Sequence, residues 1–468
     1  MPESTKRNLF GGGGMVLAED LSRYFLSVKF GDLDGKTVSE AKRRVIDALG
    51  CAIGAFRERP IEIARSVASL VSSKEPATLL GTRRKTSPDM AAFVNGFMVR
   101  YFDFNDTYLS KEPAHPSDNL GACLPVAEAE GKGGKDLLLS LILAYEIQCR
   151  LCDAADIRHR GWDHVNYGLV STALASGRLM GLDVKRSTQA VNIALNGHIA
   201  MRQVRAGELS MWKGASFSNA ARNGVFAASL AREGMTGPSP IFEGEMGFFR
   251  QVSGPFTLDV ESFGGRKGSF KINETYIKYW PAEYHSQTAV WAALELRRKV
   301  GDVGRIQSVL IESHEAGYTI LGKDPEKWRP ETKETADHSL PYIVSMALLE
   351  GKIDNSTYSP RKFRDSRVLD FVSRVEVKED RRLTELYPQN GIANRITVRL
   401  KDGSTLTEEV IVPKGHPKNP MTDEEVEAKF LRLTKRFLGE EGSRRALRLL
   451  WSLEDVKDVS DIVSALVV

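Results

Sequence analysis

Apolar residues recur at intervals of three and four positions through most of the first 275 residues. This spacing places them on one face of an α-helix. It predicts helices over 38–56, 136–155, 169–182, 186–199 and 219–234, and the apolar run 90–100 predicts a further buried helix. Most of these segments end at glycine, a common helix stop. The first part of the chain is therefore predicted to be a helical domain.

The pattern changes after about residue 276, where apolar and polar positions begin to alternate. Segments 305–313 and 373–380 predict strands, and 394–412 predicts a hairpin that turns at 401–404. The Asp-Gly pair in this turn supplies the positive φ that a tight hairpin needs. Helical segments at 285–300 and 338–351 alternate with the strands. From Thr422, with Glu425 at the capping-box position, the pattern returns to helix.

These elements predict a mainly α protein with an α+β domain. A large all-helical domain carries a smaller α+β lid domain, which is inserted before the C-terminal helices. The predicted divisions are a flexible N-terminal tail at 1–18, the helical domain at 19–275, the lid at 276–415, and C-terminal helices returning to the helical domain at 416–468. Two domains also agree with the length, because 468 residues are too many for one ordinary hydrophobic core.

Charge and apolar content narrow the possible partners. The formal net charge is only +4, with Lys and Arg spread along the chain, which argues against nucleic acid as a partner. The longest apolar run, 137–145, is about half of the ~20 residues that a membrane-spanning helix needs, so no membrane partner is predicted. The four cysteines are too sparse for a disulfide framework and predict reduced thiols in the cytoplasm.

Metal and cofactor motifs are absent from the sequence. No pair of histidines has the spacing of a zinc site, and there is no nucleophile elbow or P-loop. Cys149 and Cys152 form a C-x-x-C pair that could suggest an iron–sulfur cluster. They fall in the middle of a predicted helix, however, where a buried cysteine usually acts as a small hydrophobe. We therefore expect no metal and no cofactor.

The polar segment 101–119, YFDFNDTYLSKEPAHPSDN, follows a predicted core helix and concentrates groups that can move protons. Asp103 and His115 are its strongest candidates. Of the eight histidines, four lie in similar polar, turn-flanked settings: His115, His164, His285 and His338. A single histidine of this kind is usually structural, but four together point to a site.

Two lysines have unusual neighbours. Lys213 follows a tryptophan and precedes a predicted helix start, where an ammonium and free backbone N–H groups could hold a carboxylate. Lys278 lies between aromatic residues ahead of Pro281. Either could instead lie on the surface with its aliphatic stem against apolar side chains.

These residues fall in seven blocks in which the chain resembles the MmgE/PrpD family. The blocks are 103–107, 115–122, 161–168, 212–224, 279–293, 336–344 and 394–403, and they follow the family's order. The resemblance extends from about Leu21 to Phe430. It implies a large helical domain with an inserted α+β lid, usually in a homodimer, and reactions on small polycarboxylates without metal.

The activity that the resemblance implies is elimination of water from 2-methylcitrate, and to a lesser extent from citrate, to give 2-methyl-cis-aconitate. The blocks HPSDN, PAEYHSQTAV and ADHSLPY favour this reaction. One alternative is decarboxylation of cis-aconitate to itaconate, and another is isomerisation or epimerisation of a different polycarboxylate. A non-catalytic helical dimer that binds an acid or a partner protein is the alternative from another class. A scaffold has no use for Asp103, His115 and Lys213 together.

The resemblance also implies roles for individual residues. The predicted catalytic residues are Asp103, His115, His164 and Tyr342. The predicted substrate-binding residues are Lys213, Lys278, Asp163, His285, Ser286, Gln287 and His338. Asn105 stands where many members of the family have a second aspartate. We expect Asp103, His115 and His164 to share the proton transfers while Lys213 and Lys278 bind carboxylates. Which histidine is the base stays open.

Overall fold

The computed structural model describes residues 16–468. Of the predicted flexible tail at 1–18, residues 1–15 lie outside the described part of the chain. Helix α1 already begins at Leu17. The predicted tail therefore includes two residues that belong to a helix.

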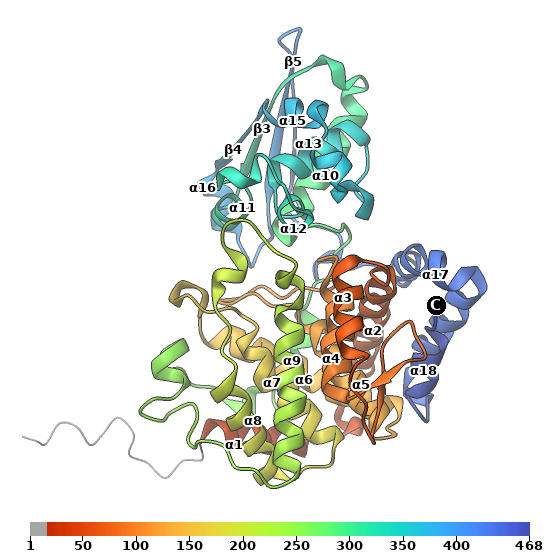
Figure 1. Ribbon diagram of the computed structural model, residues 1–468. Helices are drawn as coiled ribbons and strands as arrows, with labels where there is room; N and C mark the ends of the chain where they lie inside the picture. Colours follow the sequence, from red (N-terminus) through yellow and green to blue (C-terminus); the bar gives the residue numbers. More distant parts are fainter. Residues whose placement is uncertain (1–15) are drawn as a thin grey trace, which may run out of the picture.

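Most helices gather in one body, which forms the lower part of Figure 1. Its helices are α1 (Leu17–Ser27), α2 (Gly35–Gly54), α3 (Arg59–Ala68), α4 (Pro88–Arg100), α5 (Leu120–Ala129), α6 (Gly134–Ala154), α7 (Asn166–Leu179), α8 (Val184–Gly197), α9 (Trp212–Arg232), α17 (Asp423–Trp451) and α18 (Ser460–Ala465). A two-residue hairpin, β1 (Ala77–Thr78) with β2 (Lys85–Thr86), lies between α3 and α4. Small residues allow close packing: a Cβ added at Gly121 in α5 would lie 2.6 Å from the Cα of Gly96 in α4.

The second unit is the lid, which stands above the helical body in Figure 1. Its elements are α10 (Gln287–Val300), β3 (Ile306–Ser313), α11 (Glu315–Leu321), α12 (Lys333–Ala336), α13 (Leu340–Glu350), α14 (Pro360–Phe363), α15 (Ser366–Val372), β4 (Val375–Glu379), α16 (Arg381–Leu386), β5 (Asn394–Leu400) and β6 (Thr405–Val410). The strands form one sheet in the order β4-β3-β5-β6. Strands β3 and β4 are parallel, and the other two pairs are antiparallel.

Strand register explains how the lid builds its core. Val309 of β3 pairs with Val375 on one side and Val398 on the other, and Ile311 lies in a second apolar row two residues along. Because side chains alternate across a sheet, these rows share one face. Helices α10 and α13 pack against the strands, and the apolar rows belong to the hydrophobic core of the lid.

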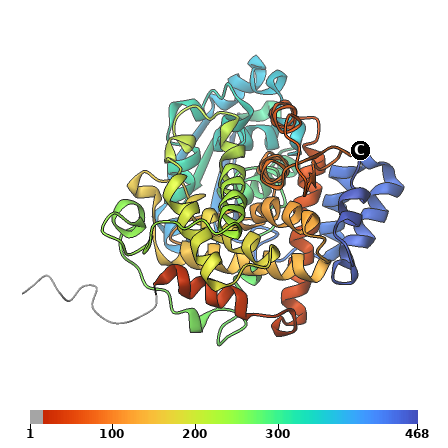
Figure 2. The same cartoon turned by 60° about the horizontal axis from the view of Figure 1, so that its bottom comes forward.

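The C-terminal helices return to the helical body, and Figure 2 shows them beside the N-terminal helices. Helix α17 packs along α2. It begins with the predicted capping box, which is confirmed: Glu425 N donates to Thr422 Oγ1 at 3.2 Å, and Thr422 N donates to Glu425 Oε2 at 2.8 Å.

The buried hydrophobic residues form two main cores, one in the helical body and one in the lid. The larger core takes residues from Leu17 to Ile277 and again from Met421 to Leu466, and the lid core runs from Ala282 to Leu400. The predicted fold class, mainly α with a smaller α+β domain, is confirmed. Along residues 16–468, no helix is both long and apolar enough to span a membrane.

The two chain crossings between body and lid lie beside the segment that follows α4. Thr107 and Tyr276 exchange two backbone hydrogen bonds of 2.8 Å, and Ile277 N donates to Gly415 O at 3.1 Å. Gly415 has φ of 91°, and a Cβ there would lie 1.8 Å from the carbonyl oxygen of Ile277. Only glycine fits this close approach. The crossing therefore fixes the position of the segment that carries Asp103.

Candidate active site

A cavity of about 630 Å³ opens between the helical body and the lid. The body contributes the charged and histidine side chains of Arg100, Asp103, His115, Arg158, His164, Arg202, Arg205 and Lys213, and the lid contributes those of Glu283, His285, Asp324, Glu326, Lys327 and His338. Six of these groups are Lys or Arg and four are carboxylates. The volume is that of an ordinary small-molecule site.

Asp103 lies three residues beyond the last residue of α4 in an unusual backbone conformation. Its φ is 50°, and among residues 16–468 it is the only residue other than glycine with positive φ. Its backbone N–H donates to Arg100 O at 3.0 Å. Aspartate tolerates the left-handed region better than most residues, and such outliers concentrate at functional sites.

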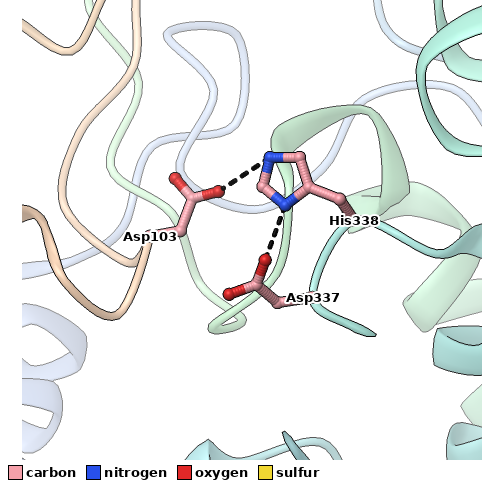
Figure 3. A group of neighbouring side chains, drawn as sticks. All are labelled: Asp103, Asp337 and His338. Carbon is pink, nitrogen blue, oxygen red and sulfur yellow. Dashed lines mark hydrogen bonds and ion pairs between the residues drawn. The ribbon is translucent and has the colours of Figure 1, made fainter. Parts of the chain in front are cut away.

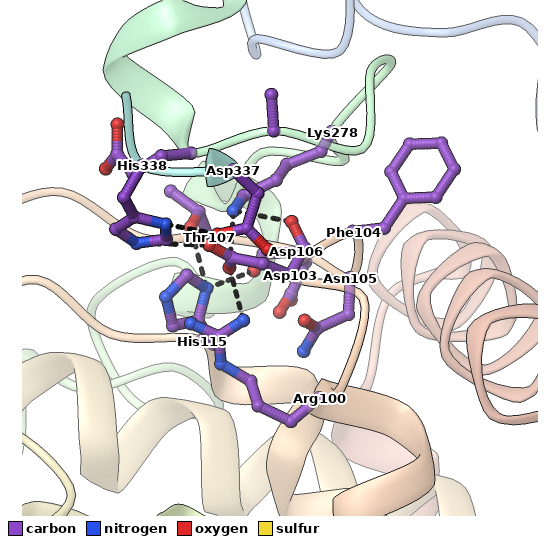
Figure 4. A network of polar contacts seen from close by, with 12 residues as sticks. Arg100, Asp103, Phe104, Asn105, Asp106, Thr107, His115, Lys278, Asp337 and His338 are labelled. Carbon is purple, nitrogen blue, oxygen red and sulfur yellow. Dashed lines mark hydrogen bonds and ion pairs between the residues drawn. The ribbon is translucent and has the colours of Figure 1, made fainter. Parts of the chain in front are cut away.

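The Asp103 carboxylate is surrounded by cations (Figure 4). Lys278 Nζ lies 2.8 Å from Oδ1 and Lys213 Nζ lies 3.3 Å from Oδ2, while Arg100 pairs with Oδ1. Burial alone would raise the pKa of Asp103, but the positive charges of Arg100, Lys213 and Lys278 outweigh it and hold the pKa well below its usual range. Asp103 therefore stays ionised and organises the cations around it.

Asp103, Asp337 and His338 could form a metal site by their type, because each offers a ligand atom and these atoms lie within 4.8 Å of one another (Figure 3). Lys213 decides against this. Its Nζ lies 3.3 Å from Asp103 Oδ2, 3.6 Å from Asp337 Oδ1 and 3.2 Å from His338 Nδ1. An ammonium thus already lies among the three groups and offsets charge of the two carboxylates, and the group suits a built-in cation better than a divalent metal.

His115 is held by the segment that carries Asp103. Its Nδ1 lies 2.8 Å from the carbonyl oxygen of Asp106 and 2.8 Å from Thr107 Oγ1. A carbonyl only accepts, so Nδ1 carries the proton. Burial, followed by the charges of Arg100 and Lys278, lowers the pKa of His115 well below its ordinary value. The ring is therefore neutral near pH 7, and its Nε2 has a free lone pair.

His164 lies beside His115, with ring centroids 5.8 Å apart. Its neighbour Asp163 accepts from Arg205 Nε at 3.0 Å and from Ser216 Oγ at 3.0 Å. Burial raises the pKa of Asp163, yet the charge of Arg205 brings it to about 2. Burial lowers the pKa of His164 to about 3, so this histidine is also neutral.

The lid contributes two more histidines to the cavity. His338 Nδ1 lies 2.6 Å from Asp337 Oδ1, and its Nε2 lies 3.4 Å from Asp103 Oδ2. Burial and the charge of Lys213 lower the pKa of His338 to about 4. His285 lies in the short 3₁₀ turn Tyr284–Ser286 just before α10, and its Nδ1 lies 2.8 Å from Nε2 of His314.

Five of the predicted site residues do not line the cavity. Lys278 and Asp163 do not line the cavity but hold residues that do, namely Asp103 and Arg205. Ser286 Oγ donates to Glu283 O at 2.6 Å. Gln287 ties the turn before α10 by bonds of 2.9–3.1 Å to Trp280 and Ala282. These two side chains shape the loop and do not line the cavity, so their predicted contacts with substrate stay predictions.

Tyr342 is the fifth predicted site residue that lies outside the cavity. It is fully buried in α13, and its hydroxyl donates to Thr357 O at 2.6 Å within the lid core. Because α13 presents this side chain to the interior of the lid, Tyr342 does not line the cavity. Its predicted catalytic role is not supported by this position.

The structure adds several cations that sequence reasoning missed. Arg202 and Lys327 line the cavity and have no ion pair or side-chain hydrogen bond among the described residues, although Lys327 is only 5% exposed. Arg158 lies 3.7 Å from Asp156, and its buried Nε lacks a hydrogen-bond partner. Burial lowers the pKa of Arg202, and the nearby charges of Arg205 and Arg158 lower it further. Unpaired cations facing a cavity indicate an anionic ligand.

Local sequence gives only weak signals for these cations. Arg202 and Arg205 lie in a basic loop, MRQVRAGE, and Arg158 precedes the GWDH block. In the sequence such residues resemble ordinary surface arginines. Only the tertiary structure places them in the cavity between the helical body and the lid. Asp337 directly precedes His338, but its partner Lys213 is 124 residues away, so the local sequence does not indicate its role.

Fold and site together define a mainly helical protein with an α+β lid and a cation-rich cavity between them. Residues 19–261 match the model of the MmgE/PrpD N-terminal domain, and residues 280–455 match that of the MmgE/PrpD C-terminal domain. The chain belongs to the MmgE/PrpD family.

Relatives of the chain have two kinds of name. It is 30% identical over 413 residues to 2-methylcitrate dehydratase of Cupriavidus necator, covering 82% of each chain. It is 31% identical over 403 residues to 2-methylcitrate dehydratase of Escherichia coli K12, covering 80% of each. Human cis-aconitate decarboxylase is 25% identical over 476 residues, covering 96% of this chain and 94% of that protein.

Proposed function

We propose that the protein is a 2-methylcitrate dehydratase that removes water from 2-methylcitrate, and from citrate more slowly, by acid/base catalysis without a metal. The observation that carries the proposal is the neutral His115, whose unprotonated Nε2 belongs to a cavity that also contains the Lys213 ammonium. Dehydration of a hydroxy acid needs this pair of functions: a base for the carbon-bound proton and a donor for the departing hydroxyl.

Charge in the cavity supports a polycarboxylate substrate. Arg158, Arg202 and Lys327 are cavity cations without a close carboxylate partner within 3.5 Å. Guanidinium and ammonium groups of this kind bind carboxylates by charge-assisted hydrogen bonds. Three carboxylates on one substrate would neutralise the three groups.

The proton path follows from the ionisation of each group. His115 takes the proton from the carbon that bears the methyl group and a carboxylate. The adjacent carbon–oxygen bond breaks, a carbon–carbon double bond forms, and Lys213 donates a proton so that water leaves. Burial lowers the pKa of Lys213, which makes it a stronger acid than an ordinary lysine.

Asp103 has a different task in this proposal from the one expected from sequence. Its carboxylate is held ionised by three cations, so it is a poor proton carrier. It places Lys213 and Lys278 and offsets their charge. His338 lies between Asp103 and Asp337 and contacts both carboxylates.

The test is a parallel product assay with purified protein. We expect the absorbance of a conjugated double bond to appear with 2-methylcitrate and more slowly with citrate. Release of carbon dioxide from cis-aconitate, with no absorbance change on 2-methylcitrate, would overturn the proposal in favour of a decarboxylase.

A further inference from the structure

His285 and His314 form a buried chain of hydrogen bonds that ends at the cavity. His314 is fully buried after β3, and its Nδ1 lies 3.2 Å from the carbonyl oxygen of Ala393. Its Nε2 lies 2.8 Å from Nδ1 of His285. The Tyr387 ring stacks on His314, with centroids 4.9 Å apart. Of the two histidines, His285 lines the cavity and His314 does not.

The chain of donors and acceptors has one consistent direction. The Ala393 carbonyl can only accept, so His314 Nδ1 carries a proton and donates it. Burial lowers the pKa of His314 to about 3, so the ring is neutral and its Nε2 is an acceptor. His285 Nδ1 must therefore donate to it. Burial and then the charge of Arg158 lower the pKa of His285 to about 3, so its Nε2 is unprotonated.

This free nitrogen lacks a partner among residues 16–468. Glu283 Oε1 lies 3.9 Å from His285 Nε2, which is too far for a hydrogen bond. Six other side chains of the cavity are Lys or Arg cations, which bind carboxylates. An unprotonated imidazole nitrogen does not bind a carboxylate, because both are acceptors. It requires a ligand with a hydrogen-bond donor.

We infer that His285 Nε2 accepts a hydrogen bond from the hydroxyl group of the substrate, and that His314 is the positioning residue that holds His285 in this tautomer. The site is thereby specific for a hydroxylated polycarboxylate over an unsaturated or deoxygenated one. The inference rests on the proposed function for the identity of the substrate. Beyond that function, the inference names the residue that recognises the substrate hydroxyl before the carbon–oxygen bond breaks.

The matched probes are citrate and propane-1,2,3-tricarboxylate, which has the same three carboxylates but no hydroxyl. We expect calorimetry to show that the wild-type protein binds citrate at least about tenfold more tightly, the value of one well-formed hydrogen bond. In His285→Phe the two affinities become equal within about twofold. In His314→Phe the preference is lost in the same way, although this residue does not touch the ligand.

The conservative variant His314→Gln separates positioning from bulk structure. Its amide can donate to Ala393 O and accept from His285 Nδ1, so the preference for citrate is retained. Equal binding of the two acids by the wild-type protein, or an unchanged preference in His285→Phe, would overturn the inference. If His314→Phe does not fold, loss of the preference in His314→Gln, with native circular dichroism, would also count against it.

Turnover of 2-methylcitrate, measured on the same preparations, distinguishes the two proposals. Turnover without a preference for citrate means that the hydroxyl is recognised elsewhere. A preference without turnover means that the inferred contact exists but the proposed reaction is wrong.

Discussion

Lys278 Nζ lies 2.8 Å from the Oδ1 atom of Asp103 and 2.9 Å from the backbone carbonyl oxygen of the same residue. One ammonium thus fixes both the side chain and the left-handed backbone of Asp103. Both groups are almost fully buried, at 1% and 2% exposure, so the pair is not screened by solvent. Asp103 lies at the centre of a group of three cations, Arg100, Lys213 and Lys278, on which the proposed reaction depends.

Replacing Asp103 by Asn should lower turnover at least about hundredfold, because Lys213 and Lys278 lose the charge that positions them. Melting temperature should also fall, since the buried Lys278 ammonium is left without a carboxylate partner among the described residues. Asp89→Asn is the matched control, because Asp89 is partly exposed at the start of α4 and lies 3.5 Å from an exposed arginine. Turnover of Asp103→Asn within a few-fold of wild type would contradict the assigned role.

Replacing His115 by Ala should lower turnover by about 10²–10⁴-fold, the usual contribution of a general base, while circular dichroism stays native. His159→Ala should leave turnover unchanged. The His159 side chain is 76% exposed and does not line the cavity. Near-normal turnover of His115→Ala would assign the base to another group.

The pH dependence of kcat should show a broad plateau. A base works while unprotonated, and burial lowers the pKa of His115 well below its ordinary value of about 6.5. Turnover therefore persists as pH falls through 6.5 and is lost only below it. Lys213 must be protonated, and burial lowers its pKa, so the alkaline limb lies below its ordinary value of about 10.5. An acid limb at or above pH 6.5 would contradict a buried, neutral base.

Replacing Lys327 by Met should raise KM for 2-methylcitrate by about tenfold or more, with little change in kcat, because it removes a charge-assisted contact made equally in ground and transition states. Lys323→Met is the control, since Lys323 is exposed in the same part of the lid and does not line the cavity. Equal kinetics for both variants would show that Lys327 does not bind substrate.

Lys429 of α17 contacts the backbone of the residues that position Asp103. Its Nζ lies 2.6 Å from Asp47 Oδ1 and donates at 2.7 Å to the carbonyls of Phe104 and Lys278. Lys429→Met should lower the free energy of unfolding by about 3–5 kcal/mol, because the Asp47 charge stays buried without a partner. Urea denaturation measures this. The double variant with Asp47→Leu should recover much of the loss, and failure to recover any would argue against the ion pair as its cause.

The sequence predicts the fold well where the reasons are local. Periodicity gives α2, predicted at 38–56 and observed at Gly35–Gly54, and β3, predicted at 305–313 and observed at Ile306–Ser313. The hairpin of β5 and β6 turns at the predicted Asp-Gly pair. Apolar spacing, glycine and capping residues act within a few positions of themselves, so they can be read without the tertiary structure.

The site is only partly predictable, because a motif gives the position of a residue but not the direction of its side chain. Asp103, His115, His164, Lys213, His285 and His338 all line one cavity. Tyr342 stands in an equally recognisable block, yet α13 directs its hydroxyl to Thr357. His314 gains its importance from its contacts with His285 and Ala393, and Arg202 from the cavity that it lines; the local sequence indicates neither.

The most direct test of the central claim is the rate of product absorbance when purified protein meets 2-methylcitrate with and without a strong chelator. Because the Lys213 ammonium lies among Asp103, Asp337 and His338 in place of a metal, we predict formation of the conjugated product at the same rate in both conditions. No absorbance on 2-methylcitrate, or a rate abolished by the chelator and restored by a divalent metal, would contradict metal-free dehydration at this site.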